Sequence, residues 1–86
     1  MTSFMAHQRG NNALKNIPVR ENFQPHFEVD ARSNEAKIVV TNKETNHSTE
    51  RTIAMNILMF SPQPTITHSF TVAYDQCVRE LSWKSK

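Results

Sequence analysis

Glycine, cysteine and long apolar runs are scarce in this chain of 86 residues, which contains one glycine and one cysteine. A single cysteine excludes an internal disulfide and is typical of a buried thiol in a reducing compartment. Gly10 alone cannot build a glycine-rich phosphate-binding loop. No apolar run approaches the roughly 20 residues that span a membrane. The sequence therefore predicts a cytoplasmic protein without a membrane segment.

Apolar residues are also few. They make up 37% of the chain, below the roughly 45–50% of an average domain, although that average counts glycine too. A short chain buries a smaller fraction of its surface than a long one, so a small core is marginal alone. We therefore expect docking on another protein, or self-association into a homo-oligomer, to complete the burial.

Charge is distributed unevenly although the net charge is only +2. The first 20 residues contain three basic side chains and no acidic one, whereas residues 21–75 contain seven acidic and four basic side chains. The last residues are basic again. This pattern predicts an acidic folded body with basic ends, so nucleic acid is a possible partner only through the ends.

Two parts follow from this pattern. Residues 1–23 are predicted to be a flexible, disordered basic arm, because their apolar residues follow no sustained period. The triplet Gly10-Asn11-Asn12 interrupts any amphipathic helix there, and Pro18 disfavours helix at Ile17. Residues 24–86 are predicted to form a single small domain.

Alternation of apolar and polar residues predicts strands in the first half of this domain. Residues 27–32 alternate after Pro25, and residues 37–42 form a second extended run. The segment between Asn42 and Asn46 is typical of a hairpin loop built on a type I turn. Asn46 is the residue expected in the left-handed region, because asparagine tolerates a positive φ.

The stretch from His47 to Phe60 continues with apolar residues at every second position from Ile53. This alternation favours a third strand over a helix, which would place Asn56 in the apolar stripe. Two prolines within residues 61–64 indicate a turn. Residues 65–72 alternate again and are rich in β-branched side chains, which favours a fourth strand.

After Ala73 the period changes to that of a helix, with apolar residues at Tyr74, Cys77, Val78 and Leu81. Trp83 would lie half-buried at its end. A longer helix starting at His68 also fits the spacing. The predicted fold is α+β: a four-stranded antiparallel β-meander followed by a C-terminal helix packed on one face.

Chemistry-bearing residues are scattered. The histidines, which lie about 20 residues apart, lack the paired spacing of a metal site; they are His7, His26, His47 and His68. Cys77 is expected to be a buried inert thiol. Glu28 and Asp30 share a strand face and are expected to be solvated. We predict no catalytic, cofactor-binding or metal-binding residue, and thus no enzyme.

The sequence instead favours a small non-enzymatic protein that binds another protein as a regulator, inhibitor or assembly adaptor, through a sheet face or edge. A third strand that is apolar on both sides would need a partner on one side. The candidate partner-binding residues are Met55, Asn56, Leu58, Met59, Phe60 and Trp83.

A second hypothesis is single-stranded nucleic-acid binding by a dimeric sheet. Such proteins combine a basic groove with exposed aromatic side chains. Here the arm would supply the contacts to phosphate, through Arg9, Lys15 and Arg20. The acidic strands weigh against this hypothesis.

Overall fold

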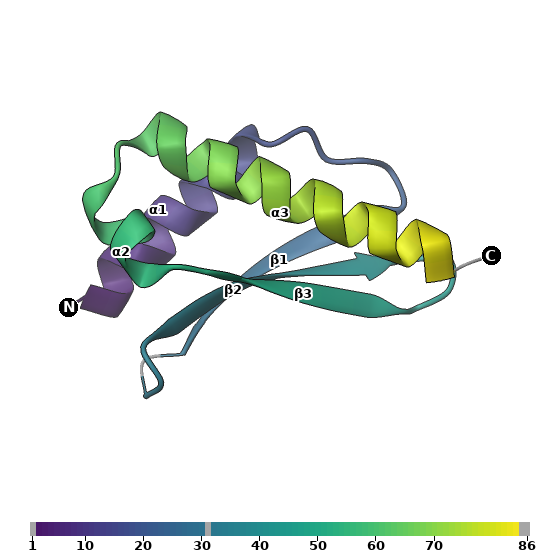
Figure 1. The fold of residues 1–86 in the computed structure, drawn as a ribbon, viewed down its shortest axis with the longest axis horizontal. Helices are drawn as coiled ribbons and strands as arrows, with labels where there is room; N and C mark the ends of the chain where they lie inside the picture. Colours follow the sequence, from purple (N-terminus) through teal and green to yellow (C-terminus); the bar gives the residue numbers. More distant parts are fainter. Residues whose placement is uncertain (1, 31, 85–86) are drawn as a thin grey trace.

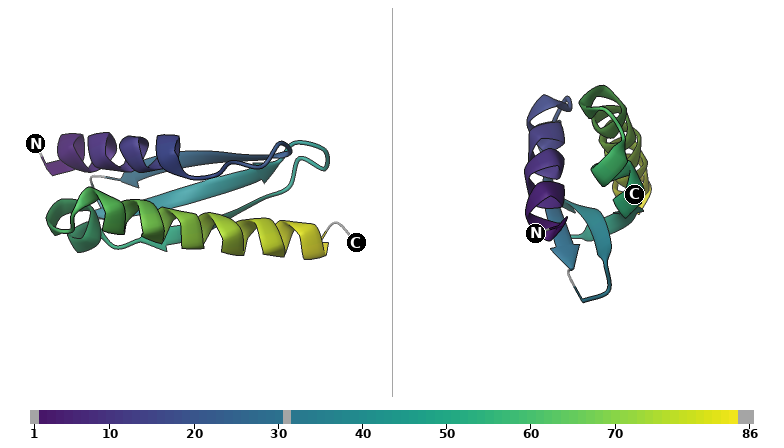
Figure 2. Two further views of the ribbon diagram at one scale, coloured as in Figure 1. Left: turned by 90° about the horizontal axis from the view of Figure 1, so that it is seen from above. Right: turned by 90° about the vertical axis from the view of Figure 1, so that its left-hand side faces the viewer.

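The protein has a sheet layer and a helix layer, as Figure 1 shows for the computed structural model, which describes residues 2–30 and 32–84. Both long helices lie on the same face of the sheet (Figure 2). The elements in chain order are α1 (Thr2–Asn16), β1 (Phe23–Asp30), β2 (Glu35–Asn42), β3 (Ser48–Ile53), α2 (Met55–Phe60) and α3 (Gln63–Lys84). The α+β class is confirmed, but the predicted four-stranded sheet is wrong, because the sheet has three strands.

The three strands form an antiparallel meander in the order β1-β2-β3. Phe23 pairs with Asn42 at one end of the first hairpin, and Asp30 pairs with Glu35 at the other. β1 thus starts before the predicted residue 27, while Ala31, inside the predicted strand, lies outside the described residues.

The second hairpin has the predicted turn chemistry. Asn46 has φ 62°, which confirms the left-handed residue. The backbone N–H of Glu44 donates to the Asn42 side-chain oxygen at 2.9 Å, which holds the start of the loop.

The third strand ends at Ile53, and residues 55–60 turn into a short helix instead of continuing the sheet. Helical backbone places Leu58 at 0% exposure in the core and packs Met55, Ile57 and Met59 partly against it. The alternation from Ile53 to Met59 wrongly predicted a strand, because a short apolar run fits the period of a helix as well as that of a strand. The prediction of a strand apolar on both sides is therefore wrong.

The predicted fourth strand is also wrong, since residues 63–84 form one continuous helix. The two prolines begin it: the N–H groups of Thr65 and Ile66 donate to the Pro62 carbonyl at 3.0 and 3.2 Å. Proline suits a first helical turn because the N–H it lacks has no partner there. The fully buried side chains recur at helical spacing and are Ile66, Phe70, Tyr74, Cys77 and Leu81.

The predicted disordered arm is a helix for most of its length. α1 buries Ala6, Gly10 and Ala13 along one side and packs on α3 and β1, and Ile17, just beyond its end, is also buried. A Cβ atom on Gly10 would come within 2.3 Å of the Phe27 ring. The glycine that interrupts the helical pattern is thus what lets α1 approach the sheet closely. The helix ends at Asn16, just before Ile17-Pro18.

The linker from α1 to β1 is held by the hydroxyl of Tyr74 in α3. This oxygen accepts a hydrogen bond from the Arg20 backbone N–H at 2.8 Å and donates to the Phe23 carbonyl at 2.7 Å. Burial raises the pKa of Tyr74. One buried phenol thereby fixes where β1 begins relative to α3.

Candidate functional site

The residues predicted to bind a partner do not form one surface. Leu58 is fully buried, and Met55 and Met59 are partly buried against the core. Phe60, at the end of α2, is 85% exposed, and Trp83 is 76% exposed rather than half-buried. α2 lies beside the first turns of α3, whereas Trp83 lies near its C-terminal end (Figure 1), so the two exposed aromatic residues lie far apart.

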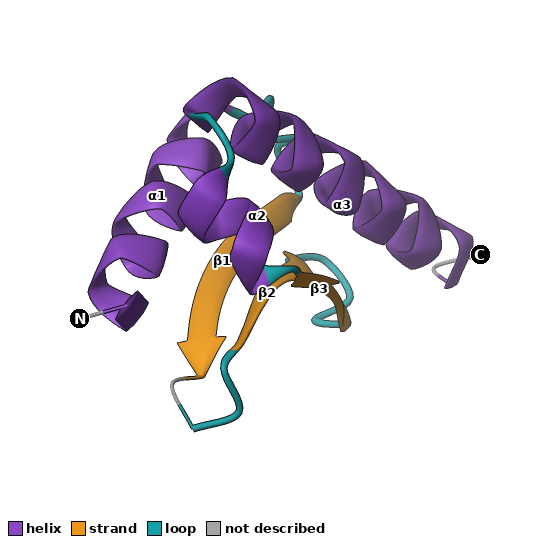
Figure 3. Cartoon of the chain, turned by 60° about the vertical axis from the view of Figure 1, so that its left-hand side comes forward, coloured by secondary structure: helices purple, strands orange, loops and turns teal. Residues whose placement is uncertain are grey.

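The cations assigned to the arm are divided between structural and exposed roles. The Arg9 guanidinium donates to the carbonyls of Leu58, Met59 and Ser61 at 3.2–3.3 Å. These carbonyls end α2, where helical acceptors lack intrahelical partners. Figure 3 shows how α1 and α2 lie side by side at this point. Only Lys15 and Arg20 of the three are exposed.

The uncovered face of the sheet is acidic. Its exposed carboxylates belong to Glu28, Asp30, Glu35 and Glu50. Lys37 at the centre pairs with Glu28 at 3.6 Å and with Glu50 at 2.8 Å. The hydrogen bond and charge of Glu50 raise the pKa of Lys37. A surface that binds single-stranded nucleic acid combines basic side chains with exposed aromatic ones. The described residues of this face do not show that combination.

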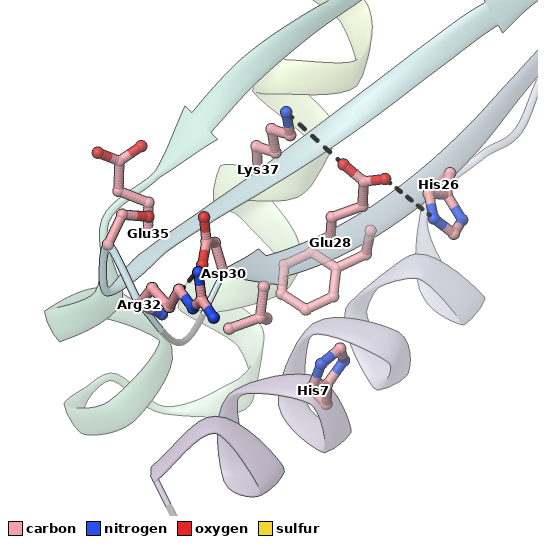
Figure 4. A pocket seen from close by; sticks show the side chains of 10 residues that line it. His7, His26, Glu28, Asp30, Arg32, Glu35 and Lys37 are labelled. Atoms are coloured by element: carbon pink, nitrogen blue, oxygen red, sulfur yellow. Dashed lines mark hydrogen bonds and ion pairs between the residues drawn. The ribbon is translucent and has the colours of Figure 1, made fainter.

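A wide hollow of about 670 Å³ lies around the second half of β1 and the turn that follows it (Figure 4). Two of its carboxylates have partners: Glu28 lies 3.7 Å from His26, and Asp30 accepts the Arg32 backbone N–H at 2.9 Å. That bond lowers the pKa of Asp30. Glu28 and Asp30 are therefore solvated groups with partners of their own.

No catalytic constellation is found in the part of the chain that the structure describes. No three histidine, cysteine or acidic side chains there gather closely enough to hold a metal ion. Cys77 is a free thiol at 0% exposure, and its burial raises its pKa, so the thiol is kept in its unreactive protonated form.

The free edge of β3 has a different character. The Asn42 N–H donates to the His47 carbonyl at 2.8 Å, which makes this a hydrogen-bonded pair in the β2–β3 register. Such pairs alternate along an antiparallel ladder. The odd-numbered residues of β3 therefore bond to β2, while Ser48, Glu50 and Thr52 direct their N–H and C=O groups outward. All three residues are exposed.

A groove of about 320 Å³ lies at the C-terminal end of β3, between Arg51–Ala54 and α3. Half of its lining is apolar, from Ile53, Ala54, Ile57, Val72 and Ala73, and the other half is polar, from Arg51, Thr52, His68, Ser69 and Gln76. Val72 is 42% exposed, one of the few large apolar side chains that the structure leaves open to solvent among the described residues. A partly apolar groove therefore lies beside Thr52, at one end of the row of outward main-chain groups.

The walls of the groove are tied together by one polar cluster. Thr49 of β3 donates a hydrogen bond to Glu80 of α3, and the Arg51 guanidinium lies 3.5 Å from the same carboxylate. Arg51 also donates to the Glu50 carbonyl at 2.8 Å. That carbonyl is thus occupied, which leaves five outward main-chain groups at Ser48, Glu50 and Thr52.

Sequence reasoning did not find this groove. It lies between β3 and residues of α3 that were assigned to a fourth strand, so the two walls were not recognised as facing each other. The sequence carried little signal for it, because residues 48–52 are all polar and show no alternation.

Comparisons of the chain with protein-family models, with characterised proteins and with solved structures give no match. None of the helices within residues 2–30 and 32–84 has both the length and the apolar character needed to cross a membrane.

Proposed function

We propose that this is a small non-enzymatic protein that binds another protein, as a regulator, inhibitor or assembly adaptor, by accepting an extended segment along the edge of β3. The single observation that carries the proposal is the juxtaposition at β3. Exposed, unpaired main-chain groups lie there beside an apolar groove.

Both halves of that juxtaposition support strand addition. In this mode of recognition, main-chain hydrogen bonds supply affinity, and pockets for alternate side chains supply specificity. Ser48, Glu50 and Thr52 offer the hydrogen bonds, and the groove beside Ile53 and Val72 offers the pocket. An exposed edge also invites pairing with another chain, and at β3 only the Glu50 carbonyl is blocked, by Arg51.

A second copy of this chain fits the edge less well than a different partner. Symmetric pairing of β3 about Glu50 would place two glutamates opposite each other, and pairing about Arg51 would oppose two arginines. Like charges directly opposite each other destabilise a strand pair. We therefore propose a heterologous partner ahead of the homo-oligomer.

Nucleic acid is a weaker candidate as a partner. Arg9 is used to cap α2, and the uncovered sheet face carries more carboxylates than cations. The cytoplasm remains the proposed location, and the free, buried thiol of Cys77 agrees with it.

The test is a selection of random heptapeptides displayed on phage against the purified chain. Binders should lose affinity at least about tenfold for Val72→Glu, which places a charge in the groove. Ser82→Glu is the matched control, because Ser82 is exposed on the same helix and does not line the groove. Equal loss in both variants, or in neither, would contradict the proposal.

Amide hydrogen exchange with a selected peptide locates the binding. The amides of residues 48, 50 and 52 should exchange freely in the isolated protein and slow markedly when peptide is bound. The amides of residues 49, 51 and 53, which bond to β2, should be slow in both states. Protection that appears elsewhere and leaves the three even-numbered amides unchanged would overturn the proposed site.

A further inference from the structure

The charges around β3 allow the chemistry of its partner to be specified. We infer, resting on the function proposed above, that the partner is a basic extended segment, with lysine or arginine opposite Glu50 and apolar residues at the alternate positions. Each part of this pattern follows from the direction of a side chain at the edge.

The pleat assigns each position of the added strand to a face. Residues paired with Ser48, Glu50 and Thr52 would present their side chains on the uncovered face of the sheet. Residues opposite Arg51 and Ile53 would present theirs beneath α3. The groove lies at Arg51–Ala54, so these inner positions are the ones that meet its apolar lining.

Charge decides the outer positions. Glu50 is the charged residue at the centre of the open edge, and opposite charges across a strand pair are favourable. Lys37, the basic residue of the uncovered face within the described strands, is already shared between Glu28 and Glu50. The remaining carboxylates on that face, Asp30 and Glu35, add to its negative potential. A cationic segment is therefore attracted and an anionic one repelled.

The groove decides the inner positions. Ile53, Ile57 and Val72 bring apolar surface to the channel, and covering it removes that surface from water. An inner arginine or lysine would meet the Arg51 guanidinium, which pairs with Glu80 on this side of the strand. Cations are thus favoured on one face of the partner strand and disfavoured on the other, which distinguishes alternation from a general preference for basic peptides.

The experiment uses three labelled, end-blocked heptapeptides and fluorescence anisotropy. The first is Thr-Val-Lys-Val-Lys-Val-Thr, and the second replaces both lysines with glutamate. The third contains the same residues as the first in the order Thr-Val-Lys-Lys-Val-Val-Thr, which places one lysine on each face and so breaks the alternation. The first should bind the wild-type chain roughly five- to tenfold more tightly than the second, and more tightly than the third.

Charge variants assign the preference to one residue. Glu50→Gln should reduce the discrimination between the first two peptides to about twofold or less, and Glu50→Lys should reverse it. Glu35→Gln is the control, because Glu35 is exposed on the same face but lies on β2, away from the β3 edge. If Glu35→Gln abolishes the preference as fully as Glu50→Gln does, the assignment to Glu50 is overturned.

Failure of this inference and failure of the proposed function give different results. Equal binding of the lysine and glutamate peptides, with loss of both in Thr52→Pro, would overturn the charge pattern and leave strand addition standing. No binding of any of the three peptides at millimolar concentration, or full binding by Thr52→Pro, would overturn the proposed function itself.

Discussion

The two edges of the sheet are built on the same ladder, yet one is closed and the other is open. At β1 the Lys43 N–H donates to the Asn22 carbonyl at 2.9 Å. The even-numbered residues of that strand therefore bond to β2, and the odd-numbered residues direct their main-chain N–H and C=O groups away from the sheet. Pro25 has no N–H, the Phe23 carbonyl is taken by Tyr74, and Phe27 is only 5% exposed. At β3 the three residues whose main-chain groups point away from the sheet, Ser48, Glu50 and Thr52, are all exposed.

The difference shows what is needed to close an edge. β1 is protected by a proline, by a tyrosine hydroxyl from α3 and by the close approach of α1, which are recognised ways of blocking strand addition. β3 has one partial substitute, the Arg51 side chain on the Glu50 carbonyl. We interpret the unprotected edge as the functional one.

The largest effect is expected from forcing α1 away from the closed edge. In Gly10→Val the added side chain would collide with the Phe27 ring, and overpacking should lower the free energy of unfolding by about 2–3 kcal/mol. The exposed neighbour Asn11→Val, measured by the same urea titration, should change it by no more than about 0.5 kcal/mol. Equal effects at both positions would contradict the close packing described for Gly10.

A smaller loss of stability is expected when the Tyr74 hydroxyl, which holds the linker from α1 to β1, is removed. Tyr74→Phe keeps the ring but leaves the Arg20 N–H and the Phe23 carbonyl without their partner. The free energy of unfolding should fall by about 1–2 kcal/mol, and the Arg20 amide should exchange faster. An unchanged exchange rate for that amide would show that the hydroxyl does not hold the linker.

Alkaline pH should lower the free energy of unfolding through two buried side chains of α3, Cys77 and Tyr74. Burial raises the pKa of Cys77 and of Tyr74 above their ordinary values of 9.0 and 10.0. Their contribution to stability is complete below pH 9.0, and it is lost as the pH rises, because the unfolded chain releases these protons first. Urea midpoints should fall more steeply above pH 9.0 in the wild type than in a Cys77→Ala, Tyr74→Phe double variant.

The smallest effect on stability is expected at the open edge. Thr52→Pro removes an N–H that points away from β2. The free energy of unfolding should therefore change by less than about 1 kcal/mol, while peptide binding is lost. Thr52→Ala, which keeps the N–H, should retain binding within about twofold. Arg51→Pro removes an N–H that bonds to β2 and should cost about 2 kcal/mol or more. Similar costs for the two prolines would disprove the assigned direction of the edge.

The sequence predicted those parts of the fold in which one local pattern has one meaning. The hairpin around Asn46, the first two strands and the end of the C-terminal helix all follow from turn chemistry or from an unambiguous period. Residues 65–72 misled because Ile66, Phe70 and Tyr74 lie four residues apart. That spacing satisfies both a helix and every second position of a strand, and burial in the core outweighed the β-branched preference of their neighbours.

The N-terminal helix could not be predicted from its own residues. Gly10 and the asparagines that follow it have poor helix propensity, and the compensation comes from Phe27 and α3, which are distant in sequence. The candidate site was missed for the same reason, because its walls come from β3 and from a helix assigned to the sheet. Local periodicity carries no information about such pairings.

The Arg9 contact with α2 joins positions about 50 residues apart, and it implies an order of events during synthesis. At about 5–20 residues per second, a ribosome needs roughly 3–10 s to add the residues that separate Arg9 from its acceptors. Through that interval α1 lacks α2 and α3, two of the elements that it contacts in the folded protein. The packing of α1 is therefore completed only after the last helix has been synthesised.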